Sequence, residues 1–153
     1  MKYYFKPDWF IILVSMLAIC GVFMLISIIK WDSILSFLFL GLMVGILVYS
    51  FAVVPLWTEV NQDYIKVKKV VGSKKFLKEK VTLTPITRDD LKGAIRVFGS
   101  GGYGGYTGWF RTKNLGKFFM LILNKDELVM IETDRGRKFV INYPHQLFDE
   151  ASK

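Results

Sequence analysis

The sequence predicts a membrane α-helical hairpin of two spans, followed by a small, mainly-β barrel or sandwich with a C-terminal helix. Three observations carry this prediction. Hydrophobic residues make up 52% of the 153 residues, two long uncharged runs occupy the first third, and the remainder alternates apolar and polar residues. We therefore expect two domains, a hairpin over residues 1–57 and a β domain over residues 58–153. The second segment is long enough for one small domain with its own core.

The two apolar runs are each long enough to cross a bilayer. Trp9 to Ile29 contains no charged residue, and neither does Ser33 to Trp57. A helix rises about 1.5 Å per residue and the hydrocarbon core is about 30 Å thick, so about 20 apolar residues make one span. The first run also exceeds the apolar core of a signal peptide. We expect two uncleaved spans joined by a short loop at residues 30–32.

Basic residues predict the orientation of the hairpin. The short loop carries one lysine, whereas a lysine run follows the second span: Lys66, Lys68, Lys69, Lys74 and Lys75. Positively charged residues near the ends of spans are enriched on the cytoplasmic side. We therefore expect both termini and the β domain in the cytoplasm.

The second span contains a G-x-x-x-G spacing at Gly41 and Gly45. Two glycines four residues apart on a helix allow another helix to approach closely. The spacing could seat the first helix of the hairpin, mark a contact with a second copy, or have no role.

The second segment predicts six or seven antiparallel strands. Period-two alternation and short apolar runs mark residues 65–68, 81–83, 95–98, 118–123, 128–133 and 138–141. Residues 124–127 and 134–137 are typical of tight hairpin turns. The residues after Pro144, with Leu147 and Phe148 adjacent, predict a short closing helix. These elements together favour a barrel or sandwich capped by that helix.

The segment from Gly99 to Gly108 is rich in glycine and aromatic residues. Its letters match G-x-G-x-x-G, but a dinucleotide site needs those glycines between a strand and a helix, and no helical pattern follows. We expect a structural, Ω-like loop in which glycines accept positive φ. Alternatively, the aromatic side chains insert into lipid headgroups or bind a peptide: Tyr103, Tyr106, Trp109 and Phe110.

Catalytic residue types are scarce. The chain has one histidine and one cysteine, which excludes a multi-histidine metal site, an intrachain disulfide and a thiolate cluster. Asp89 and Asp90 form an adjacent acidic pair, but their position before Leu91 is typical of the start of a turn. We therefore expect a protein that is not an enzyme and has no cofactor or metal.

The glycine and aromatic segment also carries a family resemblance. Residues 98–110 read FGSGGYGGYTGWF, residues 115–118 read LGKF, and two apolar runs follow at residues 128–133 and 138–141. This pattern, after an N-terminal membrane hairpin, resembles the bacterial pleckstrin-homology-like (PH-like) domain membrane proteins. The resemblance covers residues 58–153. It implies a bent, seven-stranded barrel closed by the C-terminal helix, a bacterial inner-membrane location and no settled enzymatic activity. The ordered basic signature for phosphoinositides is not recognisable, so that specificity is not carried over.

These features predict a membrane-anchored, non-enzymatic module that docks or scaffolds a protein or a lipid. The lysine run could hold the domain against anionic lipid headgroups, or could simply be a solvated strand face. We expect an unidentified protein partner and no nucleic acid, because stacking aromatic residues are not interleaved with the lysines. The alternative is an accessory subunit of a membrane enzyme or transporter that acts through its helices.

Overall fold

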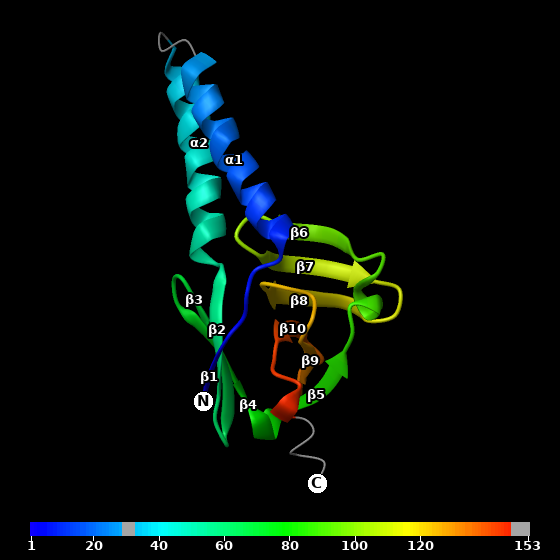
Figure 1. The fold of residues 1–153 in the computed structure, drawn as a ribbon. Coiled ribbons are helices and arrows are strands. Elements are labelled where there is room, and N and C mark those ends of the chain that lie inside the picture. The colour runs from blue at the N-terminus through cyan, green and yellow to red at the C-terminus, as the bar shows by residue number, and fades with distance from the viewer. Residues whose placement is uncertain (29–32, 148–153) are drawn as a thin grey trace.

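The computed structural model describes residues 1–28 and 33–147, and places two long helices at one end of a β domain (Figure 1). The elements in chain order are β1 (Lys2–Tyr4), α1 (Trp9–Ile28), α2 (Ile34–Ala52), β2 (Pro55–Val60), β3 (Tyr64–Lys69), β4 (Ser73–Leu77), η1 (Lys78–Lys80), β5 (Val81–Ile86), η2 (Asp89–Leu91), β6 (Ile95–Gly101), β7 (Tyr106–Thr112), β8 (Gly116–Ile122), β9 (Leu128–Thr133) and β10 (Lys138–Asn142). The predicted fold class is confirmed: two apolar helices precede a mostly-β sandwich of two sheets.

The helices are long and apolar enough to cross a membrane, by length and composition alone. Ile11 is the one buried side chain in α1 and α2, so the other apolar side chains of these two helices are at least partly exposed. The hydroxyl oxygen of Ser33 begins α2 by accepting a hydrogen bond from the N–H of Leu35, at 3.3 Å. The predicted second span was too long, because α2 ends at Ala52 and Pro55 begins a strand. Ile29 and the predicted loop at residues 30–32 lie outside the described residues.

Two sheets pack face to face. One has the order β1-β2-β3-β4, and the other has the order β5-β9-β10-β8-β7-β6. Side chains of both sheets, including Ile65, Val67, Val129 and Ile141, form one buried cluster between them. The opposite face of the second sheet buries Phe118 and Ile122 against Ile11 at the start of α1. The sheet is therefore apolar on both faces, and α1 covers part of the second one.

The predicted antiparallel meander was wrong at β8, β9 and β10. Residues 124–127 connect β8 to β9, but β10 lies between these two strands, parallel to β8 and antiparallel to β9. The side chain of Asn142, at the end of β10, fixes this crossing: its Nδ2 donates to the carbonyl oxygens of Asn124 and Glu127 at 3.1 and 3.2 Å. The connection is therefore a bridge over β10 and not a hairpin turn. The chain has ten described strands instead of six or seven, because short strands such as β1 were not recognised.

The glycine-rich segment is a β-hairpin and not an Ω-like loop. We call β6, the turn at residues 102–105 and β7 the glycine hairpin; its strand pairing runs from the pair Ile95–Arg111 to the pair Gly101–Tyr106. Its turn lies between the bases of the two helices. The N–H of Gly104 donates to Ser15 Oγ of α1 at 2.9 Å. A Cβ at Gly104 would contact Val54, just after α2, and one at Gly102 would lie 3.2 Å from Phe10 of α1. Glycine lets the turn fit there.

Gly41 and Gly45 do not seat α1. No heavy atom lies within 4 Å of a Cβ built on either glycine, so this interpretation of the G-x-x-x-G spacing is wrong. Contact with a second copy stays a prediction. The predicted closing helix lies mostly outside the described residues: a helical turn begins at residues 146–147, and Leu147 packs against the core between the sheets.

Candidate functional site

The lysine run does not form a single face. On β3, Ile65 and Val67 point into the core, so Lys66 and Lys68 point away from it. Lys75 pairs with Lys66 and shares that outer face, whereas Lys74 pairs with Val67. The Nζ of Lys74 lies 5.0 Å from the centroid of the Phe139 ring, a cation–π distance. Two faces of the sheet therefore share the lysines.

Different parts of the lysine run lie in different surroundings. The turn after Lys69 adjoins the base of α2, since the N–H of Val71 donates to the carbonyl oxygen of Ala52 at 2.8 Å. Lys74 and Lys75 line a separate pocket of about 430 Å³ with Arg135 and Arg137. The middle of the run, around Lys69, is thus held beside the helices, whereas Lys74 and Lys75 line the separate pocket.

The predicted aromatic group is divided between the two faces of β7. Tyr106 and Phe110 are buried on the face that packs against α1. Trp109 lies on the other face, where its ring meets the Phe119 ring edge-on at a centroid distance of 5.2 Å. Tyr103 is half-buried in the turn, and its carbonyl oxygen accepts a hydrogen bond from Ser100 Oγ at 2.8 Å. The four residues do not form one site.

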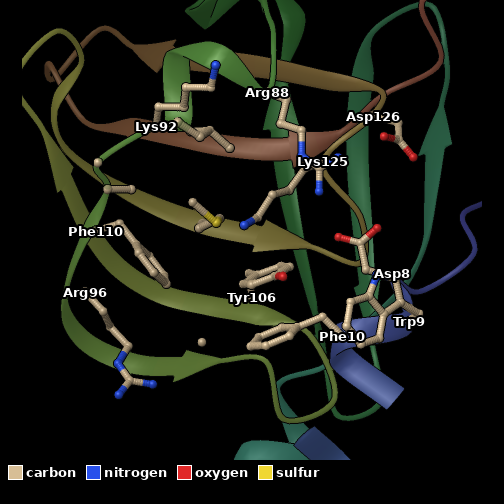
Figure 2. A pocket seen from close by; sticks show the side chains of 15 residues that line it. Asp8, Trp9, Phe10, Arg88, Lys92, Arg96, Tyr106, Phe110, Lys125 and Asp126 are labelled. Atoms are coloured by element: carbon tan, nitrogen blue, oxygen red, sulfur yellow. The ribbon is translucent and has the colours of Figure 1, made fainter. Parts of the chain in front are cut away.

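Tyr106 and Phe110 instead line a pocket of about 940 Å³ at the junction of α1 and the second sheet. We call it the junction pocket. Its ionisable side chains come from four separate parts of the chain: Asp8, Arg88, Lys92, Arg96, Lys125 and Asp126. Trp9 and Phe10, the first residues of α1, form its wall on the helix side (Figure 2). Four cationic side chains and two carboxylates make this pocket basic.

Two of the cations point into the junction pocket. Figure 2 shows Arg88 and Lys125 directed across it, whereas Lys92 and Arg96 point away from its centre. The Nζ of Lys125 lies 4.4 Å from the centroid of the Tyr106 ring. Lys92 forms an ion pair with Asp89 at 2.9 Å, but both side chains are largely exposed, so water screens the pair. Arg88 and Lys125 are therefore the pocket's best placed anion-binding groups.

The carboxyl group of Asp8 shares this pocket. Burial, and next the negative charge of Asp126, raise its pKa above the ordinary value of 3.8, although Arg88 and Lys125 oppose the rise. Burial and the charge of Asp8 likewise raise the pKa of the Tyr106 hydroxyl, against the opposing effect of Arg88. A half-buried carboxylate beside a second one is costly, and a proton on Asp8 would relieve that cost.

Replacing Asp8 by Asn is expected to stabilise the fold above pH 3.8. A raised pKa means that the folded state binds the proton more tightly than the unfolded state does. The parent protein therefore loses stability as the pH rises from the unfolded pKa through the raised folded pKa, and the Asp8→Asn variant does not. Melting temperatures of both proteins across this range measure the effect. The gain in melting temperature should vanish below pH 3.8, where Asp8 is protonated in both the folded and the unfolded state.

Asp90→Asn provides a control of opposite sign. The N–H and the hydroxyl of Thr87 donate to Asp90 Oδ2 at 2.7 and 2.9 Å, which lowers the pKa of this carboxyl. Its charged form stabilises the fold above the unfolded pKa, so Asp90→Asn should lower the melting temperature there. Equal shifts for the two variants would contradict the assigned environments.

Asn142 positions the segment that carries Lys125. Its Oδ1 accepts from the N–H of Leu123 at 2.7 Å, and its Nδ2 donates to Asn124 Oδ1 at 2.8 Å, besides the two carbonyl oxygens described above. The Nδ2 of Asn124 in turn donates to the carbonyl oxygen of Lys6, at 2.9 Å, just before Asp8. One buried amide thus fixes both the 124–127 segment and the chain entering α1.

No pattern in the sequence indicates the junction pocket. Arg88 precedes η2, Arg96 lies on β6 and Lys125 follows β8, so no short spacing in the sequence relates these three residues. Within residues 1–28 and 33–147, no group of three or more His, Cys, Asp or Glu side chains could hold a metal ion. With four cationic side chains and two carboxylates, the pocket carries a net positive charge.

Comparison with known proteins gives one match. Residues 57–144, more than half of the chain, match the family model described as a bacterial PH domain. Neither a curated protein nor a solved structure matches the chain.

Proposed function

We propose that this chain, which belongs to the bacterial PH domain family, is a membrane-anchored, non-enzymatic docking module that binds an anionic lipid headgroup in the junction pocket. In this proposal both helices cross the inner membrane and the β domain lies on its cytoplasmic side. The observation that carries the proposal is the position of a basic pocket at the first turn of a candidate membrane span.

The connections of the helices support this anchoring. β1 precedes α1 and pairs with β2, which follows α2, so both ends of the hairpin return to the same sheet. Such a connection fits two antiparallel spans that hold the domain against one surface of the bilayer. The outward-facing apolar side chains of both helices need a hydrocarbon environment. The lysines after α2 favour the cytoplasmic side.

The surface around the junction pocket also suits a membrane interface. Trp9 is 74% exposed at the start of α1, and tryptophan is enriched at the headgroup level. Figure 1 shows β6 at the helix end of the domain. Three apolar side chains of this edge strand are exposed, namely Ile95, Val97 and Phe98. We infer that β6 rests on the bilayer and that the pocket opens beside the headgroups.

Removing the two inward-pointing charges is expected to abolish selective retention of anionic lipid. The test is the Arg88→Gln/Lys125→Gln variant, reconstituted in nanodiscs of phosphatidylcholine and phosphatidylglycerol. After gentle detergent extraction, native mass spectrometry counts the phosphatidylglycerol molecules retained. A basic residue near an anionic surface contributes about 1 kcal/mol, so the double variant should bind phosphatidylglycerol roughly 30-fold more weakly.

Arg135→Gln/Arg137→Gln is the matched control, because it removes the same charge from the separate pocket beside β4. This control should retain phosphatidylglycerol as the parent protein does. Equal losses in both double variants would mean that only the net charge matters, and would overturn the junction pocket as the binding site.

A further inference from the structure

A second cavity lies on the opposite face of the second sheet. We call it the lateral groove: it has a volume of about 650 Å³ and lies between α2 and the face of β6, β7 and β8 that is directed toward the first sheet. One wall is formed by α2 residues Gly41, Leu42, Gly45, Ile46, Tyr49 and Ser50, and the other includes Phe98, Thr107, Trp109 and Phe119. Neighbouring residues on a strand point to opposite faces, so Thr107 faces this groove and Tyr106 faces the junction pocket.

The lateral groove has the dimensions of a single lipid chain. Its α2 wall runs from Gly41 to Val53, which corresponds to about 18 Å along a helix. One leaflet of hydrocarbon is about 15 Å deep, half of a bilayer core of about 30 Å. Gly41 and Gly45 leave the helix backbone uncovered, with no heavy atom within 4 Å of either Cβ position. The volume is also within the range of known ligand sites.

One residue that lines the lateral groove, Thr107, carries a buried polar group that lacks a partner. Thr107 is only 5% exposed, and its Oγ1 has no hydrogen-bond partner among the residues that the structure describes. Nearly all buried hydroxyl groups in folded proteins have a partner. Thr107 pairs with Ser100 on β6 and lies three residues after Gly104, whose added Cβ would contact Val54 just after α2. Thr107 is therefore near the end of the groove that is closest to the β domain. A ligand that fills the groove would need an apolar chain with an acceptor at that end.

We propose that the lateral groove binds one acyl chain of a membrane glycerophospholipid, and that the ester carbonyl oxygen of this lipid accepts a hydrogen bond from Thr107 Oγ1. This lipid differs from the one in the junction pocket, because the sheet separates the two sites. The inference rests on the proposed insertion of α2 into the membrane. A transmembrane helix of a second copy would fill the groove with apolar side chains, but would leave the threonine hydroxyl unpartnered. An esterified acyl chain would fill the apolar groove and would also supply the acceptor that the Thr107 hydroxyl lacks.

Photocrosslinking tests the proposal. The full chain is reconstituted in vesicles of phosphatidylethanolamine and phosphatidylglycerol that contain a phosphatidylglycerol with a diazirine on its acyl chain. Bulk lipid can label the exposed faces of α1 and α2, but it reaches Thr107 only through the groove. Label on the peptide that contains β7, relative to label on α1, therefore reports occupancy of the groove.

Two variants should lose this label. Gly45→Leu places a side chain in the groove from the helix side, where an added Cβ meets no heavy atom within 4 Å, and should reduce the relative β7 label by at least about fivefold, since the acyl chain no longer fits. Thr107→Val keeps the shape and removes the hydrogen bond, and should reduce it by about threefold. Gly21→Leu is the matched control, because Gly21 lies in α1 with equally open space around its Cβ. It should label like the parent.

Equal β7 labelling of the parent and Gly45→Leu would overturn the proposal. So would a parent protein that is a dimer and becomes a monomer on Gly45→Leu with no change in label. Carbonate extraction of the same vesicles separates this inference from the proposed function: membrane-bound protein without β7 label overturns only the groove, whereas protein released into the soluble fraction overturns both.

Discussion

Replacing Gly104 by alanine is expected to destabilise the protein by about 2–5 kcal/mol. Gly104 has a φ of +67°, a conformation that costs an L-residue about 1–2 kcal/mol. Its added Cβ would also contact a methyl group of Val54, where the turn of the glycine hairpin lies between the helices. Overpacking of this kind costs about 1–3 kcal/mol. The unfolding temperature in detergent should fall by about 5–15 °C.

Gly136→Ala isolates the packing contribution. Gly136 has a φ of +69° and no heavy atom within 4 Å of its Cβ position, so it incurs the same backbone strain without the contact. Its unfolding temperature should fall by less than half as much. If both alanine variants unfold at the same temperature, the glycine hairpin is not held tightly between the helix bases.

The second large effect is expected from Asn142→Leu, which should lower the stability by about 3–5 kcal/mol. Asn142 is 3% exposed, and leucine would leave the N–H of Leu123 and the carbonyl oxygens of Asn124 and Glu127 without their partner. Each polar group left unsatisfied in the interior costs about 1–3 kcal/mol. Chemical or thermal unfolding in detergent measures the loss. The variant should also bind less phosphatidylglycerol, because the segment that carries Lys125 loses its support.

Thr58→Val is the reference variant for the loss of stability in Asn142→Leu. Thr58 Oγ1 donates one hydrogen bond, at 2.9 Å, to the backbone carbonyl of Asn142 and is itself buried. Valine has a similar shape, so the loss should be about 1 kcal/mol. An Asn142→Leu variant no less stable than Thr58→Val would show that water replaces the amide, and that this amide does not organise the bridge over β10.

Local patterns predicted the elements better than their arrangement. The two helices and most strands were predicted because hydrophobic periodicity is encoded within each segment. The insertion of β10 between β8 and β9 was missed, because it depends on hydrogen bonds of Asn142 to residues 15 to 19 positions away. The glycine hairpin was predicted as a loop, because glycine disfavours strands in general, yet Gly99 and Gly108 are paired in this one.

The candidate site was less accessible from sequence. The lysine run was conspicuous, but strand alternation divides it between two faces of one sheet. Arg88 and Lys125 were not predicted as site residues, since they are far apart in the sequence and only the folded chain brings them to one pocket. Thr107 likewise became informative only when its hydroxyl was seen to be buried without a partner. Sites assembled from distant segments leave no short motif.

The central claim is that the helix end of the domain rests on a membrane, and the depth of spin labels in vesicles tests it most directly. In a Cys20→Ser background, one label replaces Val97 on β6, and a second replaces Glu79 in η1. The connection from β4 to β5, which contains η1, lies at the end of the molecule opposite the helices (Figure 1). Oxygen, which concentrates in hydrocarbon, should relax the label at position 97. A water-soluble nickel complex should relax the label at position 79. Equal relaxation of both labels by the nickel complex would contradict the account.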